Sequence, residues 1–179
     1  MEHSMSRRIY QFLVDDHLRL SELLEKATQG AGEIDAAPYA ALRGGLLRLI
    51  GMEEKILLPF VQKKRGGEPL SIAAKLRLDH GALASLLVPP PTLGIIATLR
   101  EVLEKHNPIE EGAGGLYEIC QSLAGSEEES LFDRLRSAPE VRVAPHADGP
   151  LVMEAMRSAL ERAGHEFSRE LKLETEKRE

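Results

Sequence analysis

The sequence contains no tryptophan, a single cysteine and few aromatic residues, and each shortage excludes a class of protein. Cys120 is the one cysteine among 179 residues, so the chain cannot form an internal disulfide framework or a thiolate metal cage. Aromatic residues make up only 4% of the chain, whereas binding of single-stranded nucleic acid depends on stacking aromatic side chains. The scarcity of thiols indicates a reducing compartment, and we expect a cytoplasmic protein.

Basic clusters and long apolar runs are also missing. Lysine and arginine number 23 against 29 acidic residues, giving a net charge of −6, which argues against a phosphate-binding surface for nucleic acid. No run approaches 18 apolar residues, and residues 1–8 lack the apolar core of a signal peptide. With 42% hydrophobic residues, we expect a soluble domain without nucleic-acid or membrane partners. The sequence leaves homo-oligomerisation open.

Clusters of glycine and proline divide the chain into segments. Breaks at 29–32, 65–69 and 89–91 leave four segments, 6–28, 37–64, 70–87 and 92–123. Each carries apolar residues three and four positions apart and is too long for a strand, so each predicts a helix. Because short connections favour antiparallel neighbours, we expect an all-α fold, an up-down-up-down four-helix bundle.

The C-terminal third predicts additional helices. Residues 126–135 carry three glutamates, at 127–129, in the first turn of a predicted short helix, where the positive end of the helix dipole favours acids. Residues 151–172 form an amphipathic pattern with Met156, Leu160, Ala163, Phe167 and Leu171 on one face. We therefore expect a bundle domain over 1–125 and a helical extension over 126–179 that packs on it.

Polar residues interrupt the apolar stripes of the four predicted bundle helices. They are His17, Glu53, His80, His106 and Glu110. Each lies near the middle of its segment, so an antiparallel bundle places them at one level. Two buried carboxylates require a compensating cation, and no lysine or arginine lies on these stripes. Neutral imidazole and carboxylate are ligands that iron, manganese or zinc accept, so the pattern predicts a metal site.

The two halves of the chain repeat this pattern. Asp16-His17 corresponds to Asp79-His80, and Glu53-Glu54 corresponds to Glu110-Glu111, in the same order. This order indicates two copies of one helical hairpin. The second copy contains His106 four residues before its acid, whereas the first has Leu49 at that position.

These residues resemble the hemerythrin-like family, also called HHE cation-binding domains, over residues 8–123. The segment HNPIEE at 106–111 is similar to the family's second His-x-x-x-Glu block, and GMEEKILLP at 51–59 is similar to the first. The resemblance implies a four-helix bundle with a non-haem di-iron site that binds or senses dioxygen or nitric oxide, stores iron, or helps repair iron–sulfur clusters.

Carried over by position, the family's ligands would be the imidazoles of His17, His80 and His106 and the bridging carboxylates of Glu53 and Glu110. Leu49 departs from the pattern and would cost one iron an imidazole. Residues 112–115 also delay Leu116-Tyr117 by two positions. The resemblance therefore implies an incomplete di-iron site, a mono-iron site, or a site that has lost its metal.

Three functions remain open at this level. One is an iron module, binding rather than catalytic, that takes up dioxygen or nitric oxide. Another is an enzyme or a factor that repairs iron–sulfur clusters. The remaining one is a metal-free structural or interaction bundle with a vestigial site.

The positions of the other polar residues indicate that they are not metal ligands. Asp16, Asp79, Glu54 and Glu111 lie about 100° around the helix from the site residues beside them, which indicates support of a ligand or exposure to solvent. His165 falls off the apolar stripe of the last helix and is a poor substitute ligand. Cys120 is expected to be a buried, inert thiol.

Overall fold

A computed structural model describes residues 7–30 and 32–168. Every element assigned within those residues is helical, which confirms the all-α prediction. The elements are α1 (Arg8–Ala27), α2 (Ala36–Met52), η1 (Glu53–Leu57), α3 (Leu58–Lys64), α4 (Ala73–Leu86), α5 (Leu93–Glu111), α6 (Leu116–Ala124), η2 (Gly125–Glu127), α7 (Glu128–Arg136) and α8 (Pro150–Ala163). No helix among them is long and apolar enough to cross a membrane.

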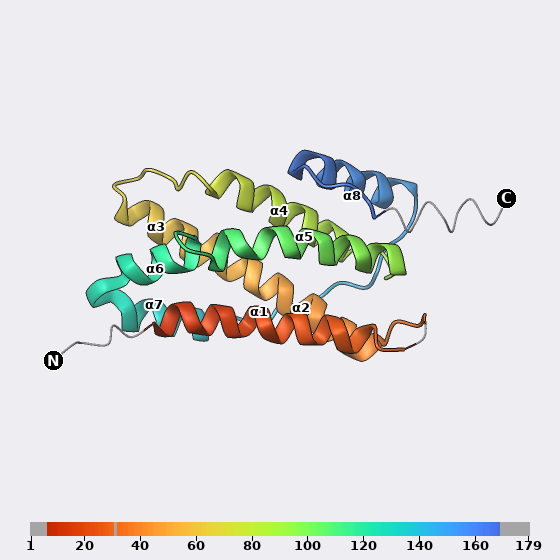
Figure 1. Ribbon diagram of the computed structural model, residues 1–179, viewed down its shortest axis with the longest axis horizontal. Helices are drawn as coiled ribbons and strands as arrows, with labels where there is room; N and C mark the ends of the chain where they lie inside the picture. The colour runs from red at the N-terminus through yellow and green to blue at the C-terminus, as the bar shows by residue number, and fades with distance from the viewer. Residues whose placement is uncertain (1–6, 31, 169–179) are drawn as a thin grey trace.

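The long helices run back and forth along the molecule (Figure 1). The chain reverses direction between α1 and α2, between α3 and α4, and between α4 and α5. Helix α1 packs on α2 and α6, α4 packs on α5, and α3 packs on α6. The core between them consists mainly of leucines. The side chains of Asp35 and Thr92 accept hydrogen bonds from the first turns of α2 and α5, and so fix where these helices begin.

The second predicted helix is continuous from α2 through α3, but it contains a π-helical turn, η1, at the position of Glu53. The amide of Leu58 donates to the carbonyl oxygen of Glu53, five residues earlier. The wider turn rotates the following side chains, so Leu57 is fully buried and Ile56 only half-buried. Ile56 packs against the edge of the core.

The fourth predicted helix is interrupted, so the single helix expected over 92–123 is wrong. Helix α5 ends at Glu111 and α6 begins at Leu116, with glycines in the connection. A Cβ on Gly115 would lie 2.5 Å from the carbonyl oxygen of Glu110, so only glycine fits this close passage. Pro108 lies inside α5.

The last helix is shorter than predicted. Helix α8 ends at Ala163, and Gly164 follows with a φ of 79°, a left-handed conformation that stops the helix. The prediction of helix over 164–168 is wrong, and residues 169–172, including Leu171, lie outside the described residues. Helix α8 packs on α4, while α7 packs on α1 and α6. The division into two domains remains a prediction.

Candidate metal centre

The structure brings the five predicted site residues together in the core. Their exposed fractions are 6% for His17, 1% for Glu53, 3% for His80, 2% for His106 and 0% for Glu110. They come from α1, η1, α4 and α5. Two overlapping groups, His80–His106–Glu110 and His17–Glu53–Glu110, each place one potential ligand atom per residue within 4.8 Å of the others.

Glu110 belongs to both groups, and its two carboxylate oxygens face different imidazoles. Oε1 lies 3.2 Å from Nε2 of His80 and 3.2 Å from Nε2 of His106. Oε2 lies 3.3 Å from Nε2 of His17. Burial raises the pKa of this carboxyl, but the hydrogen bonds with the three imidazoles outweigh burial and hold the pKa well below its usual range. Glu110 is therefore a carboxylate placed to bridge two neighbouring positions.

Glu53 is the second carboxylate of the cluster. Its Oε2 lies 3.2 Å from Nε2 of His80, and its Oε1 accepts a hydrogen bond of 2.5 Å from the hydroxyl of Tyr117. Burial raises the pKa of Glu53, and the negative charge of Glu110 raises it further. A cation beside these two acids would relieve both effects.

The three imidazoles share one orientation. Each directs Nε2 toward Glu110, while its Nδ1 faces a carboxylate outside the cluster. These outer contacts are His17–Glu111 at 3.4 Å, His80–Glu54 at 2.6 Å and His106–Asp79 at 3.3 Å. Metal-binding histidines are commonly held in this way, with one nitrogen on the ion and the other on a carboxylate that fixes the tautomer. For Glu54, Glu111 and Asp79 the sequence left open support of a ligand or exposure to solvent, and these contacts favour support.

Asp79 is fully buried, so its predicted alternative of exposure to solvent is wrong. Its carboxylate accepts from Nζ of Lys75 at 2.6 Å and lies 2.7 Å from Nε2 of His165, besides its contact with His106. Burial raises the pKa of Asp79, but these three partners lower it to about 2. His165, which the helical pattern placed away from the site, is thus buried behind His106 because the chain leaves α8 before it.

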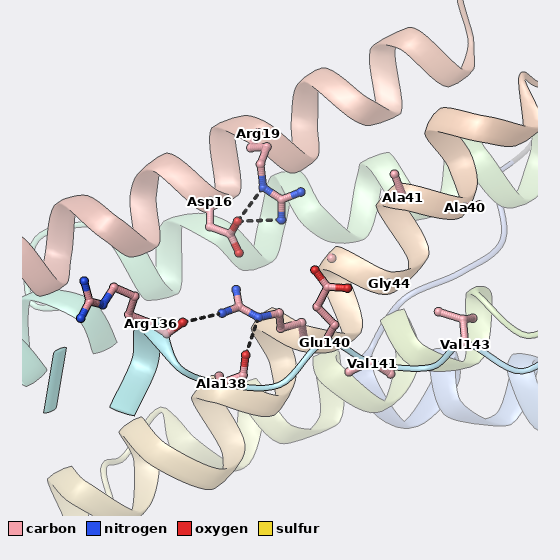
Figure 2. A pocket seen from close by; sticks show the side chains of 12 residues that line it. Asp16, Arg19, Ala40, Ala41, Gly44, Arg136, Ala138, Glu140, Val141 and Val143 are labelled. Atoms are coloured by element: carbon pink, nitrogen blue, oxygen red, sulfur yellow. Dashed lines mark hydrogen bonds and ion pairs between the residues drawn. The ribbon is translucent and has the colours of Figure 1, made fainter. Parts of the chain in front are cut away.

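Asp16 does not support His17. Its Oδ1 pairs with Nη2 of Arg19 at 2.7 Å, and the side chain faces a surface hollow of about 650 Å³. Figure 2 shows this hollow between α1, α2 and the segment around Glu140. Arg48, which also lines it, donates to the carbonyl oxygens of Arg136 and Ala138. The hollow lies apart from the His/Glu cluster, since none of the five site residues lines it.

Tyr117 is a residue of the cluster that the sequence analysis did not assign to it. It is fully buried, and its hydroxyl lies 3.1 Å from Nε2 of His17 and 3.1 Å from Oε2 of Glu110, besides its bond to Glu53. Burial raises the pKa of this phenol, and the two nearby carboxylates raise it well above its usual value. Helical spacing from Glu110 does not account for this position, because α5 ends at Glu111 and α6 begins at Leu116.

Neither Leu49 nor Cys120 supplies a metal ligand. Leu49 is buried at 1% exposure, four residues before Glu53, and offers no donor atom. Cys120 is buried, as predicted, and burial together with the charge of Glu53 raises the pKa of its thiol. The thiol therefore stays protonated at neutral pH.

Without a metal ion, protonated imidazoles supply the positive charge. Burial lowers the pKa of His17 and His80, but hydrogen bonds with the carboxylates outweigh burial and raise the two values to about 10 and about 11. Because metal ligation requires neutral imidazole, ion binding must release these protons.

These shifts predict how the stability of the metal-free protein depends on pH. A raised folded-state pKa stabilises the fold fully below the unfolded value of 6.5, and the effect is lost as pH rises toward 10 and 11. We expect the free energy of unfolding in chelator to fall between pH 7 and 9, by up to ~1.4 kcal/mol per pH unit for each histidine. Urea titrations measure it, and His80→Gln should flatten the slope. Stability that is constant or rising over this range would contradict the assignment.

Comparisons with protein-family models, with curated proteins and with solved structures gave no match for this chain.

Proposed function

We propose that this chain is a non-haem iron-binding protein built as a hemerythrin-like, up-down-up-down four-helix bundle. In this proposal iron lies beside Glu110, in one or both of the two positions, and reversibly binds dioxygen or nitric oxide. The observation that carries the proposal is the common orientation of three buried imidazoles. Each has Nε2 toward a central carboxylate and Nδ1 against an outer one, an arrangement typical of metal ligands.

The donor set fits iron and leaves room for a small ligand. Imidazole nitrogens and carboxylate oxygens suit iron in the absence of thiolates. His80, His106 and Glu110 would hold one position, and His17, Glu53 and Glu110 the other. Three side chains at a position are fewer than an octahedral ion accepts. Because Leu49 adds no further ligand, bound iron would retain open coordination positions for a diatomic molecule.

The surrounding residues prepare the site before any ion arrives. Glu54, Glu111 and Asp79 hold the three imidazole rings through Nδ1 and keep Nε2 directed inward. The leucine-rich core around them excludes bulk water, which strengthens electrostatic attraction for a cation. These features favour a binding module over an enzyme, and no separate acid or base for a substrate is evident among the described side chains.

Anaerobic titration with ferrous iron tests the proposal. We expect bound iron to raise the thermal midpoint of unfolding by roughly 5 to 10 °C at 100-fold excess over the dissociation constant. The double variant His80→Ala/His106→Ala should lose this increase. Elemental analysis after removal of free iron gives the stoichiometry. Less than about a tenth of an equivalent retained by the wild type would overturn the proposal.

A metal-free structural bundle is the second candidate, and one observation favours it. Among the described residues, none of the five site residues has a buried side-chain nitrogen or oxygen without a hydrogen-bond partner. The cluster can thus satisfy itself through protonated histidines. This candidate predicts the same thermal midpoint with and without iron, in both the wild type and the double variant.

A further inference from the structure

The hydroxyl of Tyr117 lies where three candidate ligands meet. Its oxygen is 2.5 Å from Oε1 of Glu53, 3.1 Å from Oε2 of Glu110 and 3.1 Å from Nε2 of His17. These atoms come from three different helical elements, and Tyr117 itself comes from α6. The phenol is therefore part of the same small polar volume as the His17–Glu53–Glu110 group.

Hydrogen bonds satisfy these atoms in the metal-free protein, where protonated His17 donates through Nε2. Metal binding requires neutral His17, and the phenol, which has one hydrogen to donate, then satisfies only one of the two carboxylates. A cation among the four atoms would interact favourably with every one of them.

The spacing of the atoms suits a shared ion. Tetrahedral ligands about 2.0 to 2.1 Å from a metal lie roughly 3.3 Å from one another. The contacts of Tyr117 with His17 and Glu110 are 3.1 Å, and His17 lies 3.3 Å from Glu110. These three contacts have the spacing of ligands that share one ion, whereas the 2.5 Å contact of Tyr117 with Glu53 is a hydrogen bond that would have to lengthen when an ion binds.

We propose that Tyr117 is the fourth protein ligand of the His17–Glu53–Glu110 position, and that its phenolate makes this position selective for ferric iron. The inference rests on the proposed iron site. Tyr117 supplies a ligand from α6 where Leu49 supplies none from α2. Two carboxylates and one phenolate carry three negative charges, which match a trivalent cation in a buried site. The neighbouring position is different, since its donors are two imidazoles and the shared carboxylate of Glu110.

Coordination by Tyr117 is an acid–base step without electron transfer. The phenolic O–H bond breaks, a bond forms between the oxygen and the metal, and one proton passes to solvent. When iron is supplied as the ferrous ion, dioxygen in air is the oxidant that takes one electron from each ion.

Visible spectroscopy tests this assignment directly. Protein loaded anaerobically with ferrous iron and then exposed to air should develop an intense phenolate-to-ferric charge-transfer band. Tyr117→Phe should lose this band and release iron more readily to a chelator. Tyr39→Phe is the matched control, because Tyr39 is also buried and its hydroxyl contacts no site residue and has no hydrogen-bond partner. The control should keep both the band and the iron.

The outcomes separate this inference from the proposed function. Iron retained by the wild type without a charge-transfer band overturns the role of Tyr117 and leaves the iron site standing. Failure of the wild type to retain iron defeats both proposals. Resonance Raman spectra of the wild type provide a measurement that needs no variant, since excitation in the band should enhance phenolate vibrations. Iron held equally well after reduction by dithionite would overturn the selectivity for ferric iron.

Discussion

Replacing Glu110 by glutamine is expected to abolish iron binding at both positions at once. Oε1 of Glu110 faces His80 and His106, and Oε2 faces His17. The amide of glutamine offers one oxygen that is a poor ligand and one NH2 group that donates hydrogen bonds. Loss of a residue that merely supports a ligand typically weakens metal affinity 10- to 100-fold. For this shared ligand we expect at least ~100-fold weaker binding, measured by competition with a chelator.

Glu111→Gln is the matched control for this prediction. Glu111 has the same side chain one residue later, is about one-third exposed, and contacts only the outer Nδ1 of His17 within the cluster. We expect a modest loss of affinity, confined to the position that contains His17. Equal effects of the two substitutions would indicate that Glu110 does not bridge, and that iron binds to exposed acids instead.

Replacing Asp79 by asparagine is expected to cause the largest loss of stability among the supporting residues. The buried carboxylate joins Lys75 on α4, His106 on α5 and His165 after α8. Removing one partner of a fully buried charged network typically costs ~3–5 kcal/mol. Because the side chain of Lys75 is 43% exposed and water can solvate its ammonium, we expect a loss at the lower end of that range, about 3 kcal/mol. Urea unfolding of the metal-free protein at neutral pH measures this loss.

Asp133→Asn provides the comparison for Asp79. Asp133 pairs with Arg136 on the surface of α7, where both side chains are more than half exposed. An exposed ion pair contributes at most ~1 kcal/mol. A similar small effect at Asp79 would mean that its three contacts do not hold α8 and α5 to α4.

Most helical segments and the burial of the five candidate residues in one cluster could be predicted from sequence, because both follow from local periodicity. A residue such as His17 or His80 that interrupts an apolar stripe must face the core if the helix forms at all. Burial in antiparallel helices then brings such residues to one level. The family resemblance depends on the same spacing, so it adds the expectation of iron and no independent geometry.

Tyr117 and His165 could not be placed in this way because each follows a break in its helix. The glycine connection after Glu111 sets the direction of α6, and so determines where the hydroxyl of Tyr117 lies. Gly164 ends α8 and directs His165 toward Asp79. In both cases the position depends on backbone conformations between helices and on packing against distant segments, which helical periodicity does not encode.

The π-helical turn at Glu53 has a consequence for how the two halves of the chain compare. A π-helical turn widens a helix without breaking it, whereas residues 112–115 interrupt the helix at the equivalent point of the second half. The π-helical turn begins at the acid pair Glu53-Glu54, and the interruption follows the pair Glu110-Glu111. An alignment of the halves therefore keeps its register only up to Glu53-Glu54 and Glu110-Glu111. What the two halves share is the part that carries the candidate ligands, while the segments beyond, α3 and α6, differ in length and meet each other at one end of the molecule (Figure 1).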